Sequence, residues 1–318
     1  MKKIALFALF LPSFFSMYGQ ELSVPAQTQY LADNPFIISP SYAGIGDNAR
    51  VRLNGLFQWV GVKNAPSNQS LAADFRIANR TGVGMFLYND KNGNTRQYGA
   101  KFSFAQHLTL DDDTEQYLSL GLSFNLNQFK IDIENFSNTF DPSIDGNRFT
   151  QNYNFDVGFL YRVKSFFFAF NASNILPKNI KEFNVIEPNL LANYQAYTGF
   201  SLRNGKSELE IEPSVLIQYF QSDGRSTTDL NLKLKYHNYE DFYWIGVTTR
   251  FLNDQSLTPV TVGPMLGMRH KNFYLGYSYQ INTNELLPYN SGTHMVSVGF
   301  DFLQSLSNCP CTQERIVY

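Results

Sequence analysis

The chain has 318 residues, of which 16% are aromatic and 16% are charged, and its formal net charge is −2. The charged fraction is below the roughly 25% of soluble domains, and so small a net charge gives no indication of a nucleic-acid partner. The two cysteines, Cys309 and Cys311, both lie in the C-terminal tail, so the fold is not a disulfide-stapled scaffold.

The first twenty residues, MKKIALFALFLPSFFSMYGQ, have the pattern of a secretory signal peptide. Lys2 and Lys3 precede a short apolar core from Ile4 to Phe15, and small and polar residues follow up to Gln20. This apolar run is shorter than a membrane-spanning helix requires. We therefore predict export, with residues 1–20 as the signal peptide.

Residues 21–49 form an N-terminal segment ahead of the first predicted strand. Its central part, DNPFIISPSYAG at residues 33–44, is apolar and aromatic and contains two prolines. Proline disrupts a helix interior and cannot donate a hydrogen bond in a central strand, so we predict an extended, non-helical path. The density of apolar side chains argues against a disordered leader.

Alternation of apolar and polar residues dominates the chain from residue 50 onward. In EQYLSLGLSFNLNQF, which starts at Glu115, the leucines and Phe124 share one face, and Ser, Asn and Gly occupy the other. No segment of comparable length has a helical period. We predict fourteen strands, at residues 50–60, 67–78, 81–90, 95–109, 115–129, 151–164, 165–173, 193–204, 206–220, 226–237, 241–252, 258–270, 271–281 and 292–302.

The connections between these strands predict a closed barrel over residues 50–302. Those after even-numbered strands are short, and most of those after odd-numbered strands are longer, including NDKNGNT at 89–95. This pattern is typical of outer-membrane barrels, in which short turns face the periplasm and an even strand count returns both termini there. The predicted fold class is all-β, a closed antiparallel transmembrane β-barrel of about fourteen strands in outer-membrane lipid, because lipid-embedded backbone must be fully paired.

A soluble β-sandwich or a lipocalin-like protein is the alternative fold. Strands of soluble sheets average about five or six residues, whereas many of the predicted strands reach ten or more. A tilted membrane strand needs about nine to eleven residues. The strand lengths therefore favour the membrane barrel.

A barrel offers the N-terminal segment a place to pack. Because the segment precedes the first strand, we predict that it lies on the periplasmic side or enters the lumen. Gly44 would permit a turn into the wall. The candidates for a lumen plug are Pro35, Phe36, Pro40, Tyr42 and Gly44.

Inward-facing charges of both signs predict a filled lumen rather than a wide channel of one polarity. In the hairpin of predicted strands nine and ten, Glu210 and Glu212 face the same side as Lys233 and Lys235. Antiparallel pairing about the turn near residue 223 brings Glu212 close to the two lysines. Opposite charges paired across strands stabilise by about 0.2–1 kcal/mol each.

Two other segments outside the strands are candidates for protein contacts. The loop at 174–192 carries apolar residues among charges, a pattern that suits a partner-docking surface. Its partner-contact candidates are Ile180, Phe183, Val185 and Ile186, although an inward fold that caps the barrel is the alternative. Residues 303–318 form a periplasmic tail with a Cys-Pro-Cys sequence, whose thiols are either of little consequence or a small redox or metal-binding device.

Signals for catalysis, metals and cofactors are weak. The sequence has no His-Glu-x-x-His, Gly-x-Ser-x-Gly or phosphate-binding glycine loop. The stretch DKNGNT at 90–95 begins like a calcium loop, but Thr95 stands at the position of the required glycine and Lys101 at that of the glutamate, so a polar surface loop is the simpler interpretation. We predict no enzyme activity, no cofactor and no resident metal.

Several stretches resemble the PorP/SprF family of type IX secretion system membrane proteins of the Bacteroidetes. They are TQYLADNPFIISPSYAG, LNGLFQWVGVKNAPSNQSLAADF and GVGMFLYNDKNGNTRQYG, followed later by EPSVLIQY and WIGVTTR. Ser39 departs from the asparagine that the family usually has before the second proline. The matching positions are Thr28, Gln29, Tyr30, Asn34, Pro35, Pro40, Tyr42, Ala43, Gly44, Gln58, Trp59, Val60, Gly61, Ala65, Pro66, Asn89 and Asp90.

This resemblance implies an outer-membrane barrel for protein secretion and for surface attachment of adhesins, which serve gliding in some relatives. It also implies contacts with a secreted adhesin's C-terminal domain, or with other secretion components at the periplasmic face. The alternative is a general outer-membrane channel or transporter for small or apolar solutes. A conductance measurement would separate these two functions.

Overall fold

The computed structural model describes residues 30, 34–46, 48–131, 148–177, 192–203, 207–221, 224–238, 241–254, 259–284, 287–303 and 309–313. Within this part of the chain, no helix is long and apolar enough to span a bilayer. The predicted signal peptide, residues 1–20, lies outside the described residues.

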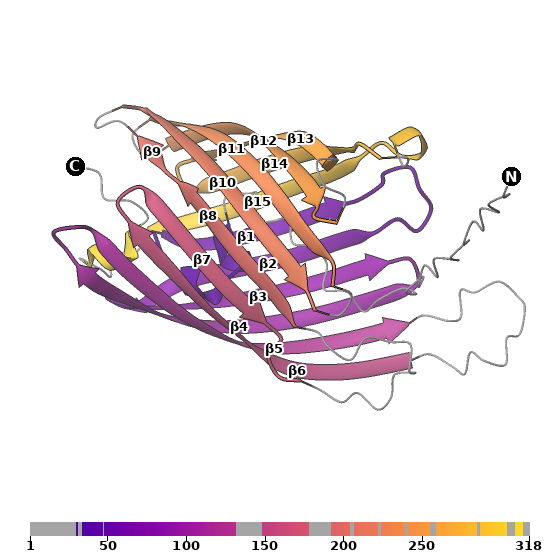
Figure 1. Ribbon diagram of the computed structural model, residues 1–318, viewed down its shortest axis with the longest axis horizontal. Coiled ribbons are helices and arrows are strands. Elements are labelled where there is room, and N and C mark those ends of the chain that lie inside the picture. The colour runs from indigo at the N-terminus through magenta and orange to yellow at the C-terminus, as the bar shows by residue number, and fades with distance from the viewer. Residues whose placement is uncertain are drawn as a thin grey trace, which may run out of the picture.

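The described part of the chain consists almost entirely of β-strands (Figure 1). The strands are β1 (Asn48–Phe57), β2 (Ser67–Ala78), β3 (Thr81–Asn92), β4 (Thr95–Asp111), β5 (Gln116–Ile131), β6 (Arg148–Val163), β7 (Phe166–Ser173), β8 (Asn193–Phe200), β9 (Leu202–Arg203), β10 (Leu209–Phe220), β11 (Ser226–Asn238), β12 (Asp241–Leu252), β13 (Pro259–His270), β14 (Phe273–Asn282) and β15 (Thr293–Leu303). The described residues also contain the short 3-10 turns η2 (Pro35–Ile37), η3 (Pro40–Tyr42), η4 (Leu287–Tyr289) and η5 (Pro310–Thr312).

The strands form one closed antiparallel sheet. Strands that follow one another in sequence pair, except β8 and β9, and β1 pairs with β15 from Asn48 opposite Leu303 to Phe57 opposite His294. Both β8 and β9 pair with β10, and they replace the single strand predicted at 193–204, which is interrupted at Ser201. Counted as one strand, they give the fourteen predicted strands and confirm the closed barrel.

The two ends of the barrel differ in their connections. At the short-turn end, β2 and β3 are joined through residues 79–80, β6 and β7 through 164–165, and β13 and β14 through 271–272. At the opposite, long-loop end, β1 and β2 are joined through 58–66 and β14 and β15 through 283–292. One predicted long connection is wrong, because the β3–β4 hairpin extends through most of NDKNGNT and turns at Gly93, whose φ is 60°.

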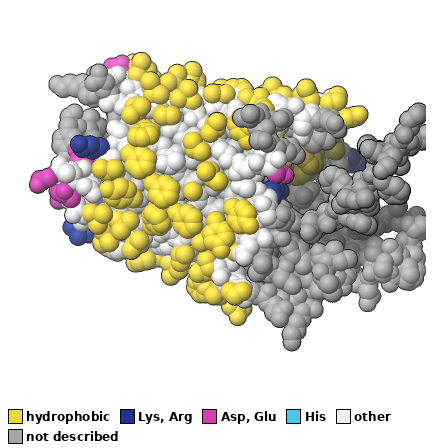
Figure 2. Space-filling model, viewed as in Figure 1, with side chains coloured by type: hydrophobic (Ala, Val, Ile, Leu, Met, Phe, Trp, Pro, Cys, Tyr) yellow, Lys and Arg dark blue, Asp and Glu magenta, His cyan; other side chains and the backbone are white. Residues whose placement is uncertain are grey.

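The alternation predicted from the sequence separates an apolar outer surface from a polar inner one. On β5, Leu120, Leu122 and Leu126 are exposed, whereas Ser119, Ser123 and Asn125 are buried. Hydrophobic side chains cover the outer face of the strands, and charged side chains gather toward the short-turn end (Figure 2). This arrangement is the one a lipid-embedded barrel requires, since only outward side chains meet lipid.

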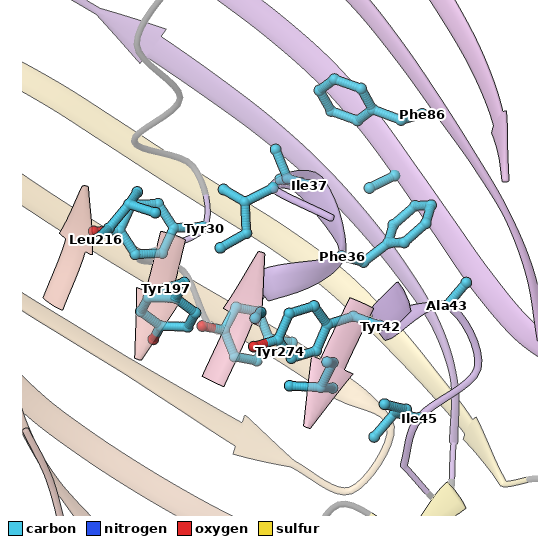
Figure 3. Close-up of a cluster of buried hydrophobic side chains, with 14 of the residues drawn as sticks. Tyr30, Phe36, Ile37, Tyr42, Ala43, Ile45, Phe86, Tyr197, Leu216 and Tyr274 are labelled. Carbon is cyan, nitrogen blue, oxygen red and sulfur yellow. The ribbon is translucent and has the colours of Figure 1, made fainter. Parts of the chain in front are cut away.

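The hydrophobic core lies inside the barrel and not between two layers (Figure 3). Wall residues such as Leu216, Trp244 and Tyr274 point inward and belong to it. The rest of the core comes from residues ahead of β1, among them Tyr30, Phe36 and Tyr42. The N-terminal segment therefore completes the interior that the wall strands enclose.

Candidate functional site: a chain segment inside the lumen

The N-terminal segment enters the lumen as two 3-10 turns, η2 and η3, and not along the extended path predicted from its prolines. Pro35 and Pro40 each occupy the first position of a turn, where a helix does not use the missing N–H group. Ser39 precedes η3, and its hydroxyl accepts a hydrogen bond from the Ser41 N–H group at 3.3 Å. Proline therefore starts these turns instead of preventing them.

The structure places four of the five plug candidates among the buried residues. Phe36, Pro40, Tyr42 and Gly44 are buried, and Pro35 is half-buried. The intervening Ile37 and Ile38 are buried as well. Tyr30 packs edge-on against Tyr197 of β8, with 5.5 Å between the ring centroids (Figure 3).

Four inward-facing glycines on the wall provide room for this segment, a feature that the sequence reasoning missed. An added Cβ would lie closer than 3.0 Å to Ala43 at Gly82, to the Phe36 ring at Gly84, to the Pro40–Ser41 backbone at Gly121 and to Ser39 at Gly158. Glycine in a strand often marks a close approach of another backbone. Glycines on the inner face of three strands, β3, β5 and β6, were the available signal.

Two buried aspartates hold the segment at its two ends. The Gly44 N–H donates to Asp74 Oδ2 at 2.9 Å, and Asp74 also pairs with Arg50 at 2.9 Å. At the other end, the Tyr30 hydroxyl donates to Asp229 Oδ2 at 3.1 Å, and Asp229 pairs with Arg250 at 2.6 Å. Each anchor is thus a wall ion pair that also accepts a hydrogen bond from the segment.

His107 of β4 adds a third anchor. Its Nε2 lies 3.0 Å from the carbonyl oxygen of Ala43, and its Nδ1 lies 2.8 Å from Ser119 Oγ. Because a carbonyl can only accept, Nε2 carries the proton. The ring is fully buried, and its two hydrogen bonds connect the segment to the wall. His107 therefore has a structural role.

The predicted lumenal charges lie together on β10 and β11. Lys235 Nζ is 2.9 Å from Glu212 Oε2, and His237 Nε2 is 2.7 Å from Glu210 Oε2. Lys233 lies over the Trp244 ring, 5.0 Å from its centroid. In the strand register, Glu210 is opposite Lys235 and Glu212 is opposite Lys233, so the salt bridge between Glu212 and Lys235 is diagonal.

Further inward charges also form ion pairs, and the strand register explains two of these pairs directly. Arg50 stands directly opposite Asp74, and Arg250 directly opposite Asp229. Lys101 Nζ lies 2.8 Å from Asp156 Oδ2. Arg52 pairs with Asp301 and stacks on the Tyr274 ring at 4.1 Å from its centroid. Opposite charges therefore compensate one another along the inner wall.

The C-terminal tail lies in the short-turn end of the barrel. Cys311 and Thr312 are completely buried, and Cys309 is half-buried. The Arg162 guanidinium donates to the carbonyl oxygens of Cys311 and Gln313, both at 2.5 Å. The sulfurs of Cys309 and Cys311 form a disulfide bond.

The predicted partner-contact residues Ile180, Phe183, Val185 and Ile186 lie outside the described residues. The described start of their loop, after β7, runs alongside β6, because the Ile175 N–H donates to the Phe155 carbonyl at 3.0 Å. The Leu176 N–H likewise donates to Asn154 Oδ1 at 2.8 Å. Both side chains are exposed. Within the described ranges, no three His, Cys, Asp or Glu residues converge on a possible metal position.

Comparison with known proteins gives one family and a set of similar barrels. The sequence model of the family described as "Type IX secretion system membrane protein PorP/SprF" matches residues 19–300. No curated protein matches the chain. Among solved structures, the "CymD monoaromatic hydrocarbon channel" is similar over 85% of this chain and 92% of its own, with a TM-score of 0.51 and 11% identity.

A second similar structure is the "TodX deltaS2S3 mutant monoaromatic hydrocarbon channel". It covers 86% of this chain and 94% of its own, with a TM-score of 0.52 and 9% identity. At such low identity, both likenesses concern the fold alone.

Proposed function

The chain belongs to the PorP/SprF family of type IX secretion system membrane proteins, and from this premise we propose how it works. It acts as an outer-membrane barrel that supports secretion and surface attachment of a large adhesin through protein contacts, without enzyme activity and without a cofactor. The observation that carries this proposal is the filled lumen. A barrel with a filled lumen can bind partner proteins at its two ends but does not provide a wide channel.

The filling has two parts. The N-terminal segment packs Phe36, Ile37 and Tyr42 against inward wall residues such as Leu216 and Tyr274. Around this core the inward charges form pairs, so the lumen does not present one sign of charge as a selective channel does. Both features favour a scaffold over a solute path.

We assign the short-turn end to the periplasm and the long-loop end to the outside, as in bacterial outer-membrane barrels generally. Both described ends of the wall support this orientation, because β1 begins and β15 ends at the short-turn end. In this orientation, other secretion components meet the short-turn end. The adhesin's C-terminal domain meets the long loops.

For the adhesin contact we retain the apolar residues of the 174–192 loop, Ile180, Phe183, Val185 and Ile186. Loops carry recognition because they tolerate sequences that strands cannot. The exposed apolar side chains of Ile175 and Leu176, at the start of the loop, support an apolar surface at this place.

Conductance tests the closed lumen. In planar bilayers, we expect the purified barrel to show no steady large openings. Steady large openings would instead support the alternative, a channel or transporter for small or apolar solutes. Deleting residues 21–45 should raise ion leakage or lower the heat stability of the barrel.

A double replacement tests the docking surface. Phe183→Asp with Ile186→Asp should leave the barrel assembled while the adhesin is lost from the cell surface. The matched control is Leu287→Asp with Tyr289→Asp, which changes two exposed residues of another long loop. Normal display from the first variant, with display lost after deletion of residues 309–318, would place the contact at the short-turn end.

A further inference from the structure

We propose that the Cys309–Cys311 disulfide is a thiol–disulfide exchange site, accessible to a dithiol reductant at the short-turn end, which sets how firmly the C-terminal tail holds the lumenal segment. The bridge closes the small turn η5, with 5.2 Å between the two Cα atoms. Neither the family nor the proposed adhesin contact assigns a role to this bond.

The tail turn and the lumenal segment meet at one place. The Gly46 N–H, at the exit of the segment toward β1, donates to the Thr312 carbonyl oxygen at 2.8 Å. Arg76 of β2 donates to Thr312 Oγ1 at 2.7 Å, and its Cγ also lies beside Gly44. The tail is therefore bonded to the end of the segment and to wall residues that the segment itself touches.

His107 makes the same connection on the other side. Its ring contacts the Ala43 carbonyl of the segment, and its own carbonyl oxygen lies 3.9 Å from the Cys311 sulfur. Arg162 fixes the turn through the carbonyls of Cys311 and Gln313. These contacts require the 309–313 backbone to keep its turn, and the disulfide constrains that backbone.

The two cysteine residues differ in burial. Cys309 is half-buried and accepts a hydrogen bond from the Thr109 hydroxyl at 3.8 Å, whereas Cys311 is completely buried. An incoming thiolate therefore reaches the Cys309 sulfur. Cys311 becomes the leaving thiolate. Arg162, whose guanidinium donates to the carbonyl oxygen of the same residue, supplies a positive charge that favours the thiolate.

The reaction balances with a dithiol as the two-electron reductant. Its first thiolate attacks the Cys309 sulfur, the Cys309–Cys311 bond breaks, and Cys311 takes up a proton as a thiol. The second thiol of the reductant then attacks the mixed disulfide and releases Cys309 as a thiol. The reductant becomes a disulfide, and the tail holds two thiols.

Reduction should loosen the tail without unfolding the barrel. The turn then loses its covalent bridge and is held by hydrogen bonds. They include Thr312 N–H to Cys309 O and Gln313 N–H to Pro310 O, both 3.1 Å, and the arginine contacts. Opening a three-residue loop restores chain freedom that corresponds to about a tenfold change in an equilibrium constant. The Gly46 N–H should report it as about tenfold faster hydrogen exchange.

The first experiment asks whether the bond exchanges in the folded protein. Dithiothreitol is added to the full-length barrel in lipid, with folding followed by gel mobility before and after heating. A thioredoxin-type protein with a single cysteine then traps the mixed disulfide, and peptide mapping identifies the sulfur. We expect reduction of the folded barrel and trapping on Cys309. Reduction only after unfolding, or trapping on Cys311, would overturn the proposal.

The second experiment asks whether exchange reaches the lumenal segment. Hydrogen exchange of Gly46 should accelerate on reduction in the natural chain, while amides of the β12–β13 hairpin stay unchanged. The Cys309→Ser, Cys311→Ser variant should exchange rapidly at Gly46 with and without dithiothreitol. Because the natural chain itself is tested, the experiment does not depend on whether that variant folds. An unchanged hydrogen-exchange rate at Gly46 on reduction would contradict the proposed hold of the tail on the lumenal segment.

Discussion

The wall strands and the lumenal segment both contain large apolar side chains, but these are exposed on the wall and buried in the segment. On the wall, large apolar side chains such as Leu122 and Ile245 are 48% and 62% exposed, because they face lipid. In the segment, Phe36 and Ile38 are 3% and 2% exposed, because they face the barrel interior. Apolar content alone therefore does not say which surface a residue belongs to.

The two regions are also held differently. Each wall strand is joined to the strands beside it in the sheet by an antiparallel ladder of backbone hydrogen bonds. The described residues of the segment, 30 and 34–46, pair with no strand. A few hydrogen bonds, to Asp74, Asp229 and His107, fix its ends, and packing against wall glycines holds the rest. A segment held by packing can loosen while the wall stays intact, and the following predictions test that difference.

Breaking a buried wall ion pair should have the largest effect. Asp301→Asn leaves Arg52, which is 2% exposed, without its carboxylate, so the free energy of unfolding should fall by about 3–5 kcal/mol. Denaturant unfolding in lipid measures it. Replacing both residues with leucine should recover most of the loss. The control Asp113→Asn, in the exposed β4–β5 turn, should stay within about 0.5 kcal/mol, and equal effects of the two asparagine variants would refute the assignment.

A charge on the lipid face should come next. Leu122→Arg lies near the middle of β5 and should lower the free energy of unfolding by about 2–4 kcal/mol. Leu122→Phe keeps an apolar outward side chain and serves as the control. If Leu122→Arg left the free energy of unfolding nearly unchanged, this face would not meet lipid.

Filling a wall glycine should affect the segment before the wall. At Gly121 a Cβ would collide with the Pro40–Ser41 backbone, which cannot turn aside, so Gly121→Ala should cost about 1–3 kcal/mol. The loss should appear as proteolysis or hydrogen exchange of residues 34–46 at denaturant concentrations where the barrel is still folded. The control is Gly276→Ala, whose Cβ would lie 3.2 Å from the Tyr274 hydroxyl oxygen, 3.3 Å from the Tyr274 ring and 3.5 Å from the Ser297 Cβ, with no backbone atom among these neighbours. Identical behaviour of the two variants would argue against the close approach.

The smallest effect should come from the serine that precedes η3. Ser39→Ala removes the acceptor for the Ser41 N–H and should cost about 1 kcal/mol of segment docking. Hydrogen exchange at the Ser41 amide measures it. Ser41→Ala removes the hydrogen bond between the Ser39 and Ser41 hydroxyls, which lie 2.7 Å apart. It keeps Ser39 Oγ as the acceptor for the amide of residue 41. If Ser41→Ala proves as costly as Ser39→Ala, the capping role of Ser39 is wrong.

Much of the barrel was predictable from the sequence, because strand alternation is local. A side chain on β5 or β6 faces lipid or lumen according to its parity, and the spacing of turn residues sets where each strand reverses. The same local signal failed where the pattern stays polar through a hairpin. NDKNGNT has the composition of a loop, yet its residues continue the β3–β4 ladder up to Gly93.

The interior needed the tertiary structure, because its contacts join residues far apart in the chain. Pro35 and Pro40 excluded a long helix and a central strand, but short turns beginning at proline depend on the packing surface that Gly84, Gly121 and Gly158 supply. The buried tail is a similar case, since nothing near Cys311 in the sequence indicates Arg162 as its partner. The sequence by itself determined the wall, whose energetics follow from period-two alternation. Only the closed barrel decided what fills it, because a lumen exists only after the last strand has paired with the first.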